Sequence, residues 1–131
     1  GMSFSDSMPA TRPPADVLLV EDNYLIALDT EEMLKELGVA EVRTAGNIEE
    51  ALGMIDAKAP EFCLLDVNLG DTKSFAVAER LAELGVRFAF VTGYGESAAI
   101  PHHLSGIIVS KPFTMQTLLQ AFTSAPEPEE G

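Results

Sequence analysis

Short runs of hydrophobic residues alternate along the chain with longer stretches in which hydrophobic residues recur every three or four positions. The short runs lack helical spacing and are bounded by turn-forming or charged residues, so they predict strands, most of them buried on both faces. Five are expected, over residues 16–20, 41–45, 61–66, 86–92 and 107–109. The alternation predicts an α/β fold with a doubly wound, five-stranded parallel sheet, right-handed crossovers and helices on both faces.

The longer stretches predict amphipathic helices that cover the sheet. The first is expected over residues 24–37 and before Gly38, and others follow the N-cap residues Asn47 and Thr114 or precede Gly85. The residues expected to face inward are, helix by helix, Ile26, Met33, Leu34 and Leu37; Ile48, Ala51, Leu52 and Ile55; Val77, Ala78, Leu81 and Leu84; and Met115, Leu118, Leu119 and Phe122. Residues 96–104 contain a proline and little periodicity, so the fourth helix is predicted to be short or irregular.

The length and composition favour one domain. A chain of 131 residues, 47% of them hydrophobic, can build a single core. Residues 1–15 are rich in Ser and Pro, begin with a Gly that resembles a cloning remnant, and are expected to form a disordered arm. The folded domain is expected over residues 16–124, followed by an acidic, Pro-rich tail over residues 125–131.

The charge and the hydrophobic runs exclude several classes of partner. A net charge of −13 repels phosphate backbones and anionic membranes, so neither nucleic acid nor a membrane is expected as a partner. No hydrophobic run is long enough to cross a bilayer, and no export signal is recognisable, so a cytoplasmic protein is expected. The single cysteine, Cys63, lies in a buried run and is expected to be a packed hydrophobic residue.

Polar residues stand at the ends of four predicted strands. Glu21 and Asp22 follow the first strand, Asp66 ends the third, Thr92 ends the fourth and Lys111 follows the fifth. Because the carboxyl ends of parallel strands meet at one edge of the sheet, these side chains are expected to converge there, although they are far apart in the sequence.

Three converging carboxylates repel one another unless one is protonated or a cation lies among them. Carboxylate and carbonyl oxygens, without His or Cys, favour Mg²⁺, with Mn²⁺ as a possible substitute. Lys111 and Thr92 can bind the oxygens of an incoming phosphoryl group, and Asp66, held ionised, can act as the nucleophile. The residues therefore predict a phosphoryl-transfer site that forms an aspartyl phosphate.

This ordered set of residues resembles the receiver domain of response regulators in two-component signalling. The matching motifs are Glu21-Asp22, Leu65-Asp66, Thr92 and Lys111-Pro112-Phe113, over about residues 16–124. The resemblance implies a flavodoxin-like, CheY-like sheet of order 2-1-3-4-5. It also implies a cis peptide bond between Lys111 and Pro112.

The resemblance also implies roles for individual residues. Asp66 would be the phosphoacceptor, and Thr92 and Lys111 would bind the phosphoryl oxygens. Asp22 and Asp66 would ligate the metal directly, Glu21 would act through water, and the Asn68 backbone carbonyl would be a further ligand. The protein would then not be a conventional enzyme, but a phosphoprotein that catalyses its own phosphorylation and dephosphorylation.

Two positions depart from the commonest receiver pattern. The aromatic switch residue often found three positions before the lysine is replaced by Ile108. The run Phe90-Val91-Thr92-Gly93-Tyr94 instead resembles the Phe-Ala-Thr-Gly-(Gly/Tyr) motif of an atypical subclass that is often made as single domains. Tyr94 is therefore the candidate for a substitute switch residue.

The expected function is a stand-alone response regulator that receives phosphate from a histidine kinase or a histidine phosphotransferase. Output would pass through an unknown downstream protein, and the protein would be a monomer or weak dimer. Alternatives are a phosphorelay intermediate, a phosphate sink and a pseudo-receiver that binds without phosphorylation. Two further classes of protein are less well supported. A flavodoxin-like cofactor binder is disfavoured because Glu21 and Asp22 would repel the phosphate of the cofactor. An aspartyl phosphatase is disfavoured because an acid/base partner for the nucleophile is missing.

Overall fold

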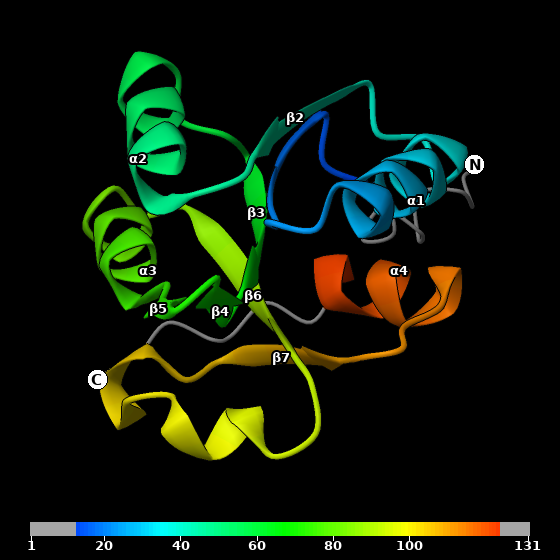
Figure 1. The fold of residues 1–131 in the computed structure, drawn as a ribbon. Helices are drawn as coiled ribbons and strands as arrows, with labels where there is room; N and C mark the ends of the chain where they lie inside the picture. Colours follow the sequence, from blue (N-terminus) through cyan, green and yellow to red (C-terminus); the bar gives the residue numbers. More distant parts are fainter. Residues whose placement is uncertain (1–12, 124–131) are drawn as a thin grey trace.

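The computed structural model describes residues 13–123, which form a five-stranded parallel sheet between two layers of helices (Figure 1). Its strand order, β2-β1-β3-β6-β7, confirms the predicted order 2-1-3-4-5. In chain order the strands of this sheet are β1 (Asp16–Val20), β2 (Glu41–Ala45), β3 (Phe62–Asp66), β6 (Arg87–Thr92) and β7 (Ile107–Ser110). All five strands of this sheet pair in parallel, so their carboxyl ends share one edge.

Three α-helices connect strands of this sheet within the described chain, α1 (Tyr24–Glu36), α2 (Ile48–Ala57) and α3 (Phe75–Glu83), and a fourth, α4 (Met115–Thr123), follows β7. Figure 1 shows α2 and α3 on one face of the sheet and α1 and α4 on the other. The fourth crossover contains only two 3₁₀ helices, η3 (Glu96–Ala99) and η4 (His102–Leu104), which confirms that its helix is short and irregular. A small hairpin of β4 (Asn68–Leu69) and β5 (Thr72–Lys73) occupies the region expected to be a turn-rich loop.

Helix caps fix the chain immediately after the strands. The Asn23 side chain accepts hydrogen bonds from the backbone N–H groups of Leu25 and Ile26, at 3.0 and 3.1 Å, and so starts α1 directly after the first acidic pair. The Asn47 side chain caps α2 by accepting from Glu50 N–H at 2.8 Å, as predicted. Such caps satisfy N–H groups that have no partner within the helix.

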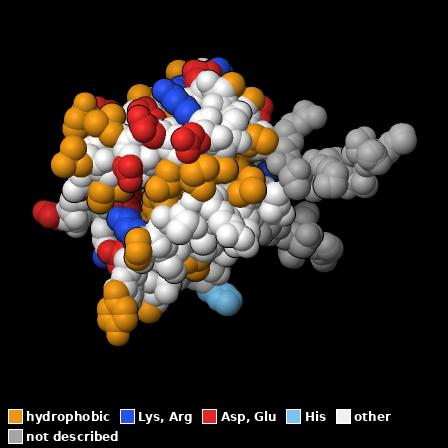
Figure 2. Space-filling view, turned by 90° about the vertical axis from the view of Figure 1, so that its right-hand side faces the viewer, with side chains coloured by type: hydrophobic (Ala, Val, Ile, Leu, Met, Phe, Trp, Pro, Cys, Tyr) orange, Lys and Arg blue, Asp and Glu red, His pale blue; other side chains and the backbone are white. Residues whose placement is uncertain are grey.

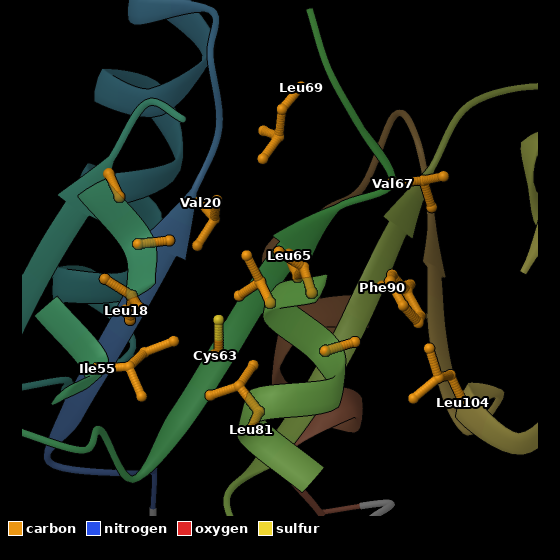
Figure 3. Packing of buried hydrophobic residues seen from close by; sticks show 14 residues of the cluster. Leu18, Val20, Ile55, Cys63, Leu65, Val67, Leu69, Leu81, Phe90 and Leu104 are labelled. Atoms are coloured by element: carbon orange, nitrogen blue, oxygen red, sulfur yellow. The ribbon is translucent and has the colours of Figure 1, made fainter. Parts of the chain in front are cut away.

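The core has two layers because successive residues of each central strand point to opposite faces. Figure 3 shows the layer beneath α2 and α3, where Leu18, Cys63, Leu65 and Phe90 lie among buried neighbours. The opposite layer, beneath α1 and α4, contains Val17, Leu19, Phe62, Leu64 and Val91. The continuous hydrophobic runs of β1 and β3 reflect this burial on both sides.

Two residues predicted to face inward are exposed instead. Ile26 is 36% exposed, because the buried face of α1 is formed by Ala27, Thr30 and Leu34. Thr30 can be buried there because its hydroxyl donates to the Ile26 carbonyl at 2.8 Å. Leu84 is 42% exposed, since it is the C-cap residue of α3 and the chain leaves the helix there.

A partly buried ion pair lies at the amino end of the sheet. Arg43 Nη2 is 2.9 Å from Asp16 Oδ2 and also donates to the Lys58 carbonyl at 2.9 Å. Asp16 begins β1 and Arg43 lies in the neighbouring β2, so the pair fastens these strands at the end opposite the carboxyl edge.

The predicted arm (1–15) and tail (125–131) fall mainly outside the described residues and stay predictions. Within residues 13–123, no helix is both long and hydrophobic enough to span a membrane.

Candidate functional site

Three carboxylates meet at the carboxyl edge of the sheet. Glu21 and Asp22 directly follow β1, and Asp66 ends the adjacent β3. One carboxylate oxygen from each lies within 4.8 Å of the other two. Glu21 and Asp66 are buried, at 6% and 5% exposure, whereas Asp22 is exposed. The predicted convergence of these side chains is therefore present in the fold.

Lys111 completes this cluster from the far side of β6. Its ammonium Nζ lies 3.1 Å from Asp66 Oδ1 and 3.9 Å from Glu21 Oε1. The Lys111 backbone N–H donates to the Thr92 carbonyl at 2.8 Å, which ties the end of β7 to the end of β6. The peptide bond between Lys111 and Pro112 is cis. One ammonium group thus contacts two buried carboxylates.

Burial and like charge make Asp66 hard to ionise in the absence of a cation. Burial, and secondarily the neighbouring Glu21 charge, raises the pKa of Asp66 to about 7, while Lys111 acts in the opposite direction. Burial also disfavours the charge of Lys111, but Asp66 and Glu21 outweigh this effect and raise the Lys111 pKa. Lys111 therefore stays protonated beside an acid whose protonation changes near neutral pH.

The donor set fits a divalent cation. Asp66 Oδ1 is buried without a hydrogen bond, because the Lys111 ammonium meets it as an ion pair without hydrogen-bond geometry. The Asp66 carboxylate also lies beside two further carboxylates, and hard oxygen ligands of this kind suit Mg²⁺. A cation would relieve the repulsion that raises the Asp66 pKa.

The other predicted site residues surround this cluster. Thr92 ends β6 and is 3% exposed, and its strand pairs in register with β7 next to Lys111. Asn68 is half-buried in β4, two residues after Asp66. Asp22 Oδ2 accepts a hydrogen bond from Gly70 N–H at 2.9 Å, so the β4–β5 turn is fastened to the acidic pair.

Glu96 was missed by the sequence analysis. Its carboxylate accepts from Gly93 N–H at 2.7 Å and from the Asn68 side chain at 2.8 Å. The hydrogen bond from Gly93 lowers the Glu96 pKa, burial opposes it, and Asn68, Lys111 and Lys73 lower it further. The sequence does contain a signal for the contact with Gly93, because an acid three residues after Gly93 has the spacing of a helix-capping interaction.

Tyr94, the candidate switch residue, is fully exposed at 105%. It lines a groove beside the cluster together with hydrophobic residues of α1, with Lys111 and with the start of the segment before α4. Ile108 is 41% exposed on the edge strand β7 and does not line that groove. The switch role of Tyr94 stays a prediction.

The fold and the site together define a class of signalling protein. The family model for the response regulator receiver domain matches residues 17–123. The chain therefore belongs to the response regulator receiver domain family, whose members are signalling modules of two-component systems.

Individual relatives agree with this assignment. The solution structure of SdrG from Sphingomonas melonis Fr1 has a TM-score of 0.75 and 34% identity, covering 89% of this chain and 98% of that chain. The phyllosphere-induced regulator PhyR of Methylorubrum extorquens is 30% identical over 75% of this chain and 38% of its own length. The transcriptional regulatory protein PdtaR of Mycobacterium tuberculosis is 34% identical over 59% of this chain and 40% of its own length. The chain spans about two fifths of these curated relatives.

Proposed function

We propose that Asp66 is the phosphoacceptor of a response regulator and receives its phosphoryl group from a histidine kinase or a histidine phosphotransferase. The observation that carries this proposal is the position of the Asp66 carboxylate, with Glu21 and Asp22 on one side and the Lys111 ammonium at 3.1 Å. A carboxylate between a cation site and a fixed ammonium is arranged to attack phosphorus, and the cation and the ammonium can stabilise the charge that develops.

In the proposed transfer, one Asp66 carboxylate oxygen attacks the phosphorus of a phosphohistidine. The P–N bond breaks, the imidazole leaves with the electron pair, and a P–O bond forms to give an acyl phosphate. Lys111 neutralises a phosphoryl oxygen, and the Thr92 hydroxyl donates to another. Lys111 stays charged throughout because two carboxylates stabilise its protonated form.

Asp22, Asp66 and the Asn68 backbone carbonyl would hold Mg²⁺ directly, with Glu21 acting through water. When bound, the ion would keep Asp66 ionised and neutralise the negative charge of the transferred group. Asp22 lies just after β1 and Asp66 ends the adjacent β3, so the pairing of these two strands sets the spacing of two of the ligands.

The groove beside Lys111 is the proposed docking surface for the histidine-bearing helix of the donor. Its hydrophobic wall is formed by Leu25, Ile26 and Leu28 of α1, which are 73%, 36% and 42% exposed. Figure 2 faces the side with α1 and α4 and shows hydrophobic side chains exposed in groups beside acidic ones. A donor helix packed in this groove would bring its phosphohistidine to Lys111 and Asp66, because Lys111 belongs to both groove and site.

The phosphoacceptor assignment is tested by incubating the protein with phosphoramidate and Mg²⁺ and measuring its intact mass. Wild type should gain one phosphoryl group that is lost on mild hydrolysis. Asp66→Ala should gain none, whereas Asp71→Ala, which removes an exposed carboxylate from the nearby β4–β5 turn, should gain it normally. A gain that persists in Asp66→Ala contradicts the assignment.

The docking surface is tested with Leu25→Asp, which places a charge in the hydrophobic wall. Transfer from a phosphorylated histidine kinase or phosphotransferase should slow by roughly tenfold or more, since a charge would be desolvated on docking. Transfer from phosphoramidate should stay unchanged, because this small donor needs no groove. Leu84→Asp is the matched control, an exposed leucine at the C-terminal end of α3. Equal slowing of both variants would rule out this surface.

A phosphorylated Asp66 would act on an unknown downstream protein, and a relay or sink role remains the alternative for the same chemistry. Back-transfer of the label from Asp66 to a histidine phosphotransferase would favour the relay.

A further inference from the structure

The Glu96 carboxylate lies beside the proposed phosphorylation site but has no part in the roles assigned above. One oxygen accepts from Gly93 N–H at 2.7 Å, and the other accepts from the Asn68 side-chain amide at 2.8 Å. Gly93 directly follows Thr92, and Asn68 is two residues from Asp66. The donors that hold Glu96 therefore lie two residues beyond the end of β3 and one residue beyond the end of β6.

The surroundings of Glu96 are those of a bound anion. Lys73 Nζ donates to Asn68 Oδ1 at 2.7 Å, so an ammonium supports the amide that contacts Glu96. N–H groups and ammonium groups together also bind phosphoryl oxygens, so the same donors suit either anion.

A phosphoryl group on Asp66 would bring a second anion to this end of the sheet. The phosphoryl group would repel the Glu96 carboxylate and compete with it for the Gly93 N–H. Glu96 can be displaced at modest cost, since it begins η3, a 3₁₀ helix of four residues that buries none of them.

We propose that Glu96 is an internal competitor of the phosphoryl group, which holds the Gly93 N–H before phosphorylation and gives it up when Asp66 is modified. This inference rests on the proposed phosphorylation of Asp66 and adds a residue that sets its rate. It also links the modified site to η3, because the residue that is displaced is the first residue of that helix.

A purely structural role for Glu96 makes a different prediction. Glu96→Gln keeps the length of the side chain and an oxygen that can accept from Gly93 N–H, so a structural contact with Gly93 would survive, whereas the amide nitrogen cannot accept from the Asn68 side chain. The same change removes the negative charge and weakens the hydrogen bond from Gly93 N–H. A side chain that competes with the phosphoryl group for this N–H would therefore compete less well in the variant. The variant separates the two roles.

The experiment compares the rate of phosphorylation by phosphoramidate and Mg²⁺ in the wild type, Glu96→Gln, Glu96→Ala and Glu36→Gln. Glu36 is an exposed acid at the C-terminal end of α1, and its replacement controls for the change in net charge. Glu96→Gln and Glu96→Ala should react roughly tenfold faster than wild type, because a charge-assisted hydrogen bond no longer has to be given up. Glu36→Gln should stay within about twofold of wild type.

Hydrogen exchange provides the second measurement. Phosphorylation of the wild type should increase amide exchange across residues 94–104, and unmodified Glu96→Ala should already show the faster exchange. Normal labelling of all variants at the wild-type rate would overturn the role of Glu96 while leaving the proposed function intact. Absence of label from every variant, including wild type, would overturn both.

Discussion

Replacement of Asp66 by Asn should stabilise the metal-free protein, and the gain should depend on pH. In the folded protein, burial and then the Glu21 charge raise the Asp66 pKa to about 7, whereas an unfolded chain restores a value of about 3.9. Between these values the folded protein binds more protons than the unfolded chain. The contribution of Asp66 to stability is therefore most favourable below about pH 4 and is lost as the pH rises to about 7.

The size of the effect follows from the difference between the two pKa values. A difference of about three pH units sets an upper bound of about 4 kcal/mol on the cost of ionising Asp66 in the fold. Water at the open edge screens this charge, so we expect about half, ~2 kcal/mol, at about pH 8. Asn removes the charge with little change of shape. The expected rise in Tm is roughly 8 °C at about pH 8 and about a third of that at about pH 5.

The assay is thermal unfolding in EDTA, followed by circular dichroism, at both pH values. Asp71→Asn is the control, since it removes an exposed carboxylate from the β4–β5 turn and should change the Tm by less than about 2 °C. Equal gains for Asp66→Asn at the two pH values would refute the reasoning, as would an equal gain for Asp71→Asn.

Two further predictions concern the acidic site and the far end of the sheet. Mg²⁺ at about ten times its dissociation constant should stabilise the wild type by about 1.4 kcal/mol at neutral pH, and Asp22→Asn should lose most of this gain in the same melting assay. No stabilisation of the wild type would contradict a working cation site. At the opposite end, Asp16→Asn should lower the free energy of unfolding in urea by about 2–3 kcal/mol, because it leaves Arg43 partly buried without its partner. The double variant Asp16→Asn/Arg43→Met should lose less than the sum of the single losses, and strict additivity would contradict this coupling.

The sequence by itself determined the sheet and the residues at its carboxyl edge. The hydrophobic runs of β1 and β3 end at Glu21 and Asp66, and the end of β7 is followed by Lys111. Parallel strands must present these ends at one edge, so the meeting of these side chains could be predicted from order alone. The weak periodicity of residues 96–104 likewise indicated the absence of a full helix.

Only the tertiary structure decided which face of α1 is buried and where Glu96 lies. Ile26 and Ala27 are both hydrophobic, so their order along the chain does not say which one packs on the sheet. The position of α1 against the sheet decides that Ala27 is buried and Ile26 is exposed. The contacts of Glu96 with Gly93 and Asn68 depend on how an irregular segment folds back over a neighbouring strand end. Regular elements repeat one local geometry that a pattern can reveal, whereas such contacts depend on packing between segments distant in the chain.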